Sequence, residues 1–183
     1  PDSALLKFDE FLRNLPAGVQ VFSLLLAHPE LLGLIAEVMG SAPALAEALS
    51  HNPGLFDAVL GSEFSHDLGP KDELLDELRQ ILARCRDHQD VLDESRRWAN
   101  EAKFQVGIQI MRGSVDAHTA GAILSDLADS VMGALLPKVW EEFAVKHGVI
   151  PGSKFAVVAM GKLGAREMTA GSDLDLVFLY DVP

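Results

Sequence analysis

The feature that most constrains the fold is a change in hydrophobic periodicity at Gly148. Before this residue, apolar side chains recur at the spacing of amphipathic helices, and Pro, Gly, Asn and Ser interrupt the pattern repeatedly. After it, residues 155–159 form a continuous apolar run that is too short for a helix and predicts a buried strand. Residues 173–180 predict a second strand. The sequence therefore predicts an α+β fold, in which a mostly helical N-terminal region precedes the opening strands of a sheet.

Turn-forming residues divide the chain into three predicted parts. Short helices are expected in residues 1–70, where the polar, helix-poor passage 61–70 is the best candidate for an internal linker. A bundle of longer helices is expected in residues 71–150, and a sheet domain should begin in residues 151–183. In the last long helix, we expect Pro137 to cause a bend or an interruption.

Composition limits the partners of the chain. Its 183 residues carry a formal charge of −12, so its surface should repel nucleic-acid phosphates and anionic lipid, and we expect neither as a partner. The most apolar windows, residues 19–27 and 155–160, fall far short of the roughly 20 residues that span a bilayer. Cys85 is the single cysteine, and the first residues do not resemble a secretory signal. We therefore expect a cytoplasmic location.

Two carboxylates stand at the head of the second predicted strand. Side chains alternate along a strand, so Asp173 and Asp175 should share one face, about 7 Å apart at roughly 3.3 Å per residue. Two unpaired carboxylates at this spacing repel each other, and an oxygen-preferring divalent ion, Mg²⁺ above all, would make the arrangement favourable. By itself, Asp-Xaa-Asp at a strand start is also common surface chemistry. The pattern predicts a magnesium site only together with its surroundings.

A glycine-containing turn supplies those surroundings. Gly161 and Gly164 follow the first predicted strand, and backbone without side chains can approach phosphate oxygens closely. Taken alone, Gly-Lys-Leu-Gly would more often be an ordinary turn than a phosphate site. A Walker phosphate loop is excluded, because Ala156 stands where its first glycine belongs and Leu163 follows the lysine where Ser or Thr is required.

The combination resembles a known signature. A glycine turn after one strand, followed by Ser-Asp-Xaa-Asp entering a second, resembles the polymerase-β-like nucleotidyltransferase superfamily and its mixed sheet. The sequence of residues 161–176, GKLGAREMTAGSDLDL, is similar to that of the glutamine synthetase adenylyltransferase family within this superfamily. The resemblance extends, less specifically, to residues 8–22 and 95–112. Where superfamily members usually have Ser after the first glycine, this chain has Lys162.

The resemblance implies roles for individual residues. Asp173 and Asp175 would be catalytic and would hold Mg²⁺, with ATP as the substrate. Nucleotide would be bound by the turn and the residue before the carboxylates, namely Gly161, Lys162, Gly164 and Ser172. Superfamily members use a third carboxylate from a later strand, and no such strand occurs before Pro183. We therefore expect these 183 residues alone to be inactive.

The resemblance also implies a function. Proteins of this family carry two nucleotidyltransferase domains, one that adds AMP to a tyrosine of glutamine synthetase and one that removes it by phosphorolysis, which regulates nitrogen assimilation. The sequence of residues 166–169 and the long helical region before it favour the adenylylating half. Glutamine synthetase and a PII-type signalling protein are the implied partners. Two alternatives stay open: a piece of the adenylyl-removing half, and a helical interaction module that binds no nucleotide.

Other chemistry-bearing residues carry weaker signals. Arg96, Arg97 and Lys103 indicate an exposed cationic helix face more than a nucleotide contact. Asp126 and Asp129 are expected to be solvated. The histidines lack the spacing of zinc ligands, and Cys85 beside one of them is expected to be packing or surface; they are His28, His51, His66, His88, His118 and His147.

Overall fold

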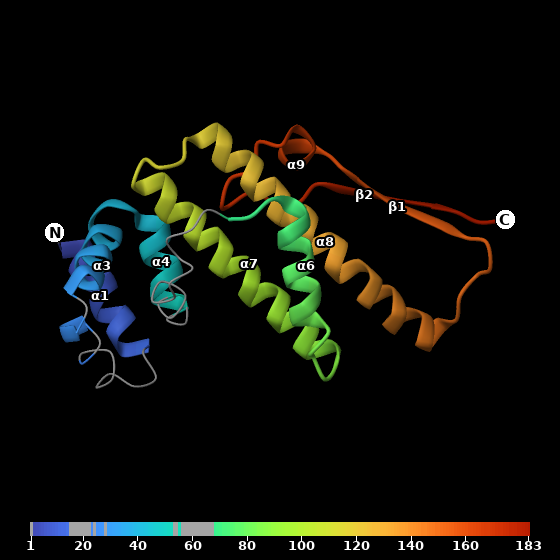
Figure 1. Cartoon of the computed structure of the whole chain (residues 1–183), viewed down its shortest axis with the longest axis horizontal. Helices are drawn as coiled ribbons and strands as arrows, with labels where there is room; N and C mark the ends of the chain where they lie inside the picture. The colour runs from blue at the N-terminus through green and yellow to red at the C-terminus, as the bar shows by residue number, and fades with distance from the viewer. Residues whose placement is uncertain (1, 15–22, 24, 28, 53–54, 56–67) are drawn as a thin grey trace. The chain divides into compact units, whose positions relative to one another are not determined.

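The computed structural model of the chain describes residues 2–14, 23, 25–27, 29–52, 55 and 68–183 (Figure 1). They belong to two compact units, which comprise Pro1–His66 with Gly107–Ser114, and Asp67–Val106 with Val115–Pro183. Residues 61–67 of the predicted linker and 15–22 of the resemblance lie outside the described residues. The predicted boundaries at residues 70 and 150 stay predictions.

The first unit is helical in its described residues. Its helices are α1 (Asp2–Asn14), α3 (Pro29–Ser41) and α4 (Pro43–His51), together with the last residues of α7. Phe11 of α1 and Ile35 of α3 are fully buried in its core. The buried Ser50 hydroxyl of α4 lies 3.1 Å from the carbonyl oxygen of Lys7 in α1. Apolar packing and this hydrogen bond hold α1 and α4 together.

The second unit begins with the predicted long helices, which the structure confirms as α6 (Lys71–Leu82), α7 (His88–Met111) and α8 (Ala117–His147). Leu74, Leu78 and Leu82 recur every fourth residue along α6, so they lie on one face, and all are buried. Asp116 precedes α8 and accepts a hydrogen bond from the Thr119 backbone N–H at 2.7 Å. This bond satisfies one of the N–H groups that the first turn of a helix leaves free.

Helix α8 is the longest described element and contains Pro137, where a bend or an interruption was expected. The proline lies inside the helix, which continues without interruption to His147 and is capped by Gly148 at φ 80°. The interruption is therefore not observed. Proline removes one backbone hydrogen bond, but α8 is held by packing before this point at Ala134 and after it at Trp140, whose ring contacts Phe155.

By length and composition α8 is also apolar enough to cross a membrane, as is the bent pair formed by α3 from Leu31 and α4. The core helix of a folded domain passes the same test, and α8 has that character. Its Leu124 and Leu127 belong to the buried cluster that also contains Leu78 of α6 and Val106 of α7. The expectation that the protein has no membrane partner stays a prediction.

The predicted strands form a hairpin. Strand β1 (Lys154–Ala159) pairs antiparallel with β2 (Leu176–Asp181), and the short helix α9 (Gly161–Ala165) lies between them in sequence. Register runs from Lys154 opposite Asp181 to Ala159 opposite Leu176. Helices followed by strands confirm the predicted α+β fold.

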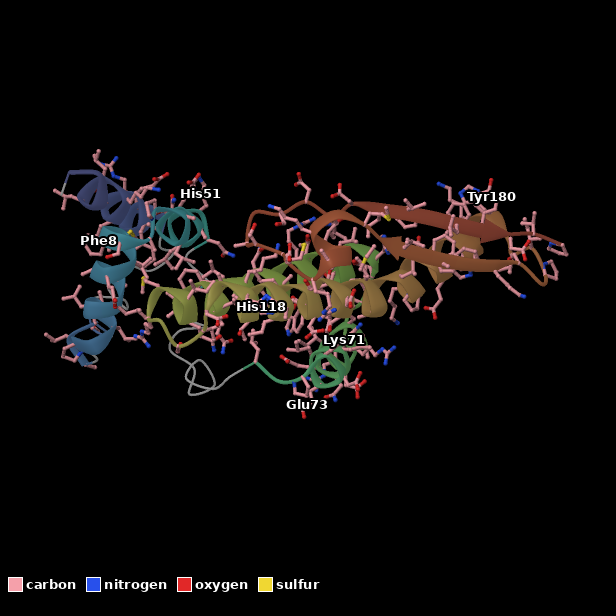
Figure 2. All side chains as sticks on the ribbon, turned by 90° about the horizontal axis from the view of Figure 1, so that it is seen from above. Phe8, His51, Lys71, Glu73, His118 and Tyr180 are labelled. Carbon is pink, nitrogen blue, oxygen red and sulfur yellow. The ribbon has the colours of Figure 1, made fainter. Side chains whose placement is uncertain are left out.

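The prediction that residues 155–159 form a buried strand is wrong in one respect. The strand exists, but Phe155 and Val158 are partly exposed, as are most side chains of β2, including Phe178 at 57%. Tyr180 of β2, which is labelled in Figure 2, is 78% exposed. Among the described residues the sheet has two strands, so each strand has one neighbour and its faces are only partly covered. Continuous apolar strands are typical of sheets that are covered on both faces.

Candidate functional site

The predicted glycine turn and the predicted carboxylates meet where β1 ends. The Met160 N–H donates to the Asp175 carbonyl oxygen at 2.8 Å, which extends the strand pairing by one residue. Gly161 follows with a φ of +53°, and a Cβ built on it would lie 2.2 Å from Oδ2 of Asp175. The carboxylate of Asp175 therefore lies directly against the Gly161 backbone. Only glycine leaves room for it there and adopts this φ without strain.

The carboxylates lie before the strand and not within it. The predicted second strand begins at residue 173, whereas β2 begins at Leu176. The reason is the length of the neighbouring strand, because β1 ends at Ala159, whose partner in the register is Leu176. Asp173 and Asp175 are both exposed in the segment that leads into β2. The assignment of these two residues as catalytic and metal-binding stays a prediction.

The predicted turn is a five-residue helix, α9, that ends in a Schellman motif. The Glu167 N–H donates to the Lys162 carbonyl oxygen at 2.8 Å, and the Arg166 N–H to that of Leu163 at 3.0 Å. A Cβ on Gly164 would lie 2.7 Å from the Ala159 carbonyl oxygen. Gly164 therefore allows α9 to pack on the end of β1, a role that sequence reasoning did not assign to it.

Helix α9 docks on α8 through apolar and ionic contacts. Leu163 and Met168 are 3% and 7% exposed and belong to the same buried cluster as α8. A Cβ on Gly121 would lie 3.2 Å from Cα of Glu167, so glycine in α8 allows close approach of this backbone. An isolated glycine in a helix pattern usually has such a packing reason, and it was the one signal in the sequence for this contact.

Asp126 and Asp129, expected to be solvated, are partly exposed at 29% and 24%, and both are paired. Asp126 pairs with Arg166 at 2.5 Å, and Asp129 pairs with Arg166 at 3.5 Å and with Lys71 at 2.7 Å. The two aspartates are three residues apart in α8, so they share a helix face. Sequence reasoning missed this cluster because its cations come from elements 40 and 58 positions away from the respective aspartates.

The other predicted nucleotide-binding residues differ in their surroundings. Lys162 is exposed and, within residues 68–183, takes part in no ion pair. The Ser172 hydroxyl accepts a hydrogen bond from the Thr169 backbone N–H at 2.9 Å and lies 2.7 Å from the Thr169 hydroxyl oxygen. Ser172 therefore closes the tight turn that leads to Asp173. Its proposed contact with nucleotide stays a prediction, as does that of Lys162.

The carboxylates fit a magnesium ion in their chemistry. Neither Asp173 nor Asp175 forms an ion pair with any residue that the structure describes. The described residues also contain no group of three or more His, Cys, Asp or Glu side chains that could hold a metal ion. Mg²⁺ is commonly bound by one or two carboxylates together with substrate phosphates and water, so a pair of oxygen donors beside a bare backbone suits it.

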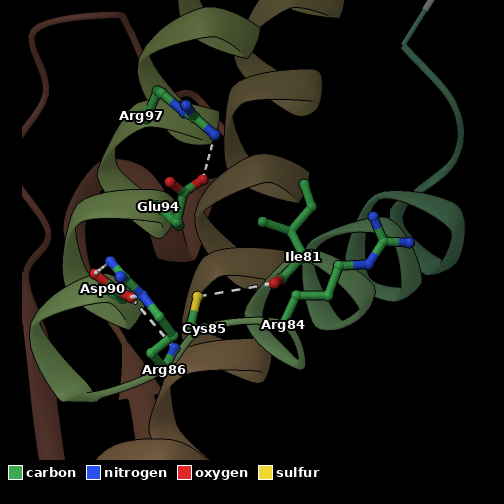
Figure 3. Close-up of a pocket in the computed structure, with 7 residues that line it drawn as sticks. All are labelled: Ile81, Arg84, Cys85, Arg86, Asp90, Glu94 and Arg97. Atoms are coloured by element: carbon green, nitrogen blue, oxygen red, sulfur yellow. Dashed lines mark hydrogen bonds and ion pairs between the residues drawn. The ribbon is translucent and has the colours of Figure 1, made fainter.

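A pocket of about 420 Å³ lies elsewhere, between the end of α6 and the start of α7 (Figure 3). Its charged groups are largely paired, Arg86 with Asp90 at 2.8 Å and Arg97 with Glu94. The hydrogen bond from Arg86 lowers the pKa of Asp90. Burial, and then the carboxylates of Glu94 and Asp90, raise the pKa of the Cys85 thiol. The pocket includes none of the predicted site residues.

Of the other two cations of the predicted cationic helix face, Lys103 is exposed and Arg96 has a partner. Arg96 pairs with Asp93 at 3.1 Å, and both side chains are exposed. These contacts agree with the expected exposed cationic face.

Comparison with known proteins adds the family. Residues 32–183 match the sequence model of the family described as glutamate-ammonia ligase adenylyltransferase. The chain belongs to this family. The resemblance that residues 161–176 carry is thereby confirmed.

The relatives of this chain are much longer than it is. Proteins named bifunctional glutamine synthetase adenylyltransferase/adenylyl-removing enzyme are 46% identical to it in Mesorhizobium japonicum and 43% identical in Brucella melitensis and Agrobacterium fabrum. Each match covers 180 residues, which is 98% of this chain and 18% of the relative.

Proposed function

We propose that the protein containing this chain is an enzyme that transfers AMP from Mg-ATP to a tyrosine of glutamine synthetase. The observation that carries the proposal is the contact between Gly161 and Asp175, because it brings a bare backbone and an unpaired carboxylate together at one strand end. The names of the relatives, which include both adenylyltransferase and adenylyl-removing activity, support the choice of reaction.

Each residue then has a part in binding. Asp173 and Asp175 would hold magnesium. When bound, the ion would neutralise the negative charge that develops on the phosphates. Gly161 lets the phosphates approach the backbone without a Cβ in the way. Lys162, exposed at the second position of α9, donates its ammonium to a phosphate oxygen in place of the hydroxyl that superfamily members usually provide.

The sequence of residues 166–169 supports placing this chain in the adenylylating half of the enzyme and not in the adenylyl-removing half. A PII-type signalling protein as regulator, a cytoplasmic location, and the absence of nucleic-acid or membrane partners complete the proposal. The acidic composition of the chain, with a formal charge of −12, supports the last two exclusions.

The test removes one carboxylate at a time from a protein that carries this sequence at the full length of its relatives. Asp173→Asn and Asp175→Asn should each abolish transfer of label from radiolabelled ATP to glutamine synthetase, and should remove Mg²⁺-dependent ATP binding at this site. Asp181→Asn is the matched control, because Asp181 is an exposed carboxylate at the opposite end of β2. It should retain full transfer.

The same variants separate the alternatives. Loss of phosphorolysis of adenylylated glutamine synthetase with intact forward transfer would assign the chain to the adenylyl-removing half. If both Asn variants kept their activity in both directions and their affinity for ATP, these aspartates would have no role in nucleotide chemistry. The helical interaction module would then be the remaining alternative.

A further inference from the structure

Arg166 has an unusual backbone conformation for its residue type. Among the described residues, it is the only residue other than glycine with a positive φ, at 59°. It occupies the position after α9 where a Schellman motif usually has glycine, because a Cβ is disfavoured in this left-handed conformation. Glycine would therefore satisfy the backbone better, and the reason for arginine must lie in its side chain.

The side chain of Arg166 spans one turn of α8. Its two terminal nitrogens reach different carboxylates, Asp126 at 2.5 Å and Asp129 at 3.5 Å, and one of them also lies 3.4 Å from the Ala122 carbonyl oxygen. Lys71 of α6 pairs with the same Asp129 oxygen at 2.7 Å. The aspartates are 29% and 24% exposed, so the cluster is partly shielded from water. A planar guanidinium is suited to such a two-point contact.

The same residue is tied to the candidate site through its backbone. The Arg166 and Glu167 N–H groups donate to the carbonyls of Leu163 and Lys162, so the orientation of α9 follows that of Arg166. At its other end α9 begins with Gly161, against which the Asp175 carboxylate lies. The buried contacts of Leu163 hold α9 on the bundle but are non-directional, whereas the ion pairs are directional.

We propose that Arg166 is a positioning residue for nucleotidyl transfer, which fixes α9, and with it Gly161 and Lys162, to α8 through Asp126 and Asp129. The inference rests on the proposed function. Arg166 itself contacts no reacting group in this role. It keeps the backbone that phosphates approach in its position relative to the carboxylates. Misplacement of such a group by about 1 Å can lower the rate about 100-fold.

The test compares variants that break the cluster from each side, in the full-length protein. Arg166→Gly removes the guanidinium and introduces a residue that favours the left-handed backbone conformation. The double variant Asp126→Asn with Asp129→Asn removes the carboxylates that pair with Arg166 and leaves residue 166 unchanged. Both should lower kcat about 10- to 100-fold and change KM for ATP by a smaller factor. Arg166→Lys, which keeps the charge but can contact only one point, should be intermediate.

Two controls make the result specific. Asp76→Asn breaks an exposed ion pair with Arg79 on α6 and should leave kcat unchanged. The variant that combines Arg166→Gly with both aspartate changes should be no slower than the double aspartate variant, because both lack the contact of Arg166 with α8 and both lack the Lys71–Asp129 pair. Normal kcat in Arg166→Gly, or equal losses in Arg166→Lys and Arg166→Gly, would overturn the proposal.

A readout independent of turnover separates this inference from the proposed function. Amide hydrogen exchange at Gly164 and Glu167 should be about 10-fold faster in the double aspartate variant, while exchange at buried Leu78 should be unchanged. Unchanged exchange at both amides would overturn the positioning role. If Asp175→Asn were active while exchange accelerated as expected, the proposed function alone would fail.

Discussion

The helices and the hairpin of the second unit use similar apolar side chains in opposite ways. Leu78, Leu127 and Val106 are buried between α6, α7 and α8, whereas Val177, Phe178 and Leu179 of β2 are about half exposed. The difference teaches that these two parts are held by different forces. Burial of apolar area stabilises the bundle, while the described hairpin depends on backbone pairing and on the anchoring of Leu163 and Met168.

The candidate site lies where these two parts join. Gly161 and Asp175 come from the hairpin side, and Arg166 connects them to α8 of the bundle. Substitutions in the bundle should therefore change mainly stability, and substitutions at the junction should change mainly function.

The largest effect should come from the bundle core. Leu78→Ala should lower the free energy of unfolding by about 2–5 kcal/mol, because it removes a fully buried side chain and leaves a cavity. Leu179→Ala is the same chemical change in the exposed part of β2 and should cost at most about 1 kcal/mol. Urea unfolding of the 183-residue chain followed by far-UV circular dichroism measures both. Equal losses would mean that the hairpin is as well packed as the bundle.

The next effect should come from the junction. Gly161→Ala places a methyl group where the Asp175 carboxylate lies and forces a non-glycine residue to φ +53°. We expect adenylyl transfer to fall about 100-fold or more, because the site is displaced by about 1 Å.

Gly171→Ala is the matched control for this change, since a Cβ there has no described atom within 4 Å. Transfer measured with radiolabelled ATP should be near normal in the control. Similar losses in the two variants would show that the Gly161 contact has no special importance.

A smaller effect should follow from Lys162→Ala. Loss of one exposed charge-assisted hydrogen bond should weaken ATP affinity by about 1.5 kcal/mol, roughly 10-fold, and should leave the unfolding free energy unchanged. Calorimetric titration of the full-length protein with ATP and Mg²⁺ measures this. An affinity equal to that of the unchanged protein would mean that the ammonium faces water in the complex too.

The smallest effect concerns the start of α8. Hydrogen bonds from Thr119 lower the pKa of Asp116, so the folded state favours the charged form. This contribution to stability is present above the unfolded pKa, about 3.9, and is lost as the pH falls through the lower folded value. Asp116→Ala should therefore lower the thermal midpoint slightly at pH 7, with a difference that shrinks below about pH 4.

Thermal unfolding at several pH values measures this difference, and Asp116→Asn, which keeps a capping side chain without the charge, is its control. A difference between Asp116→Ala and the unchanged chain that does not vary with pH would contradict a charged cap.

Local pattern predicted the elements well and their surroundings poorly. The long helices, the change of structure at Gly148 and both strands follow from periodicity and turn residues, which act over a few positions. The start of β2 did not follow, because it depends on where β1 ends. Exposure of the strands did not follow either, because apolar composition shows what a residue favours and not how many neighbours cover it.

The sequence by itself determined the family, the α+β character, and the residues that lie near the candidate site. The reason is that Gly161 follows β1 and the two aspartates precede β2, so the pairing of these two strands brings the glycine and the carboxylates to the same end. Only the tertiary structure decided that Asp175 lies against Gly161, that Gly164 packs on β1, and that Asp126 and Asp129 hold Arg166. These contacts depend on the docking of α9 on α8, and docking is set by packing and charge across residues that no local period connects.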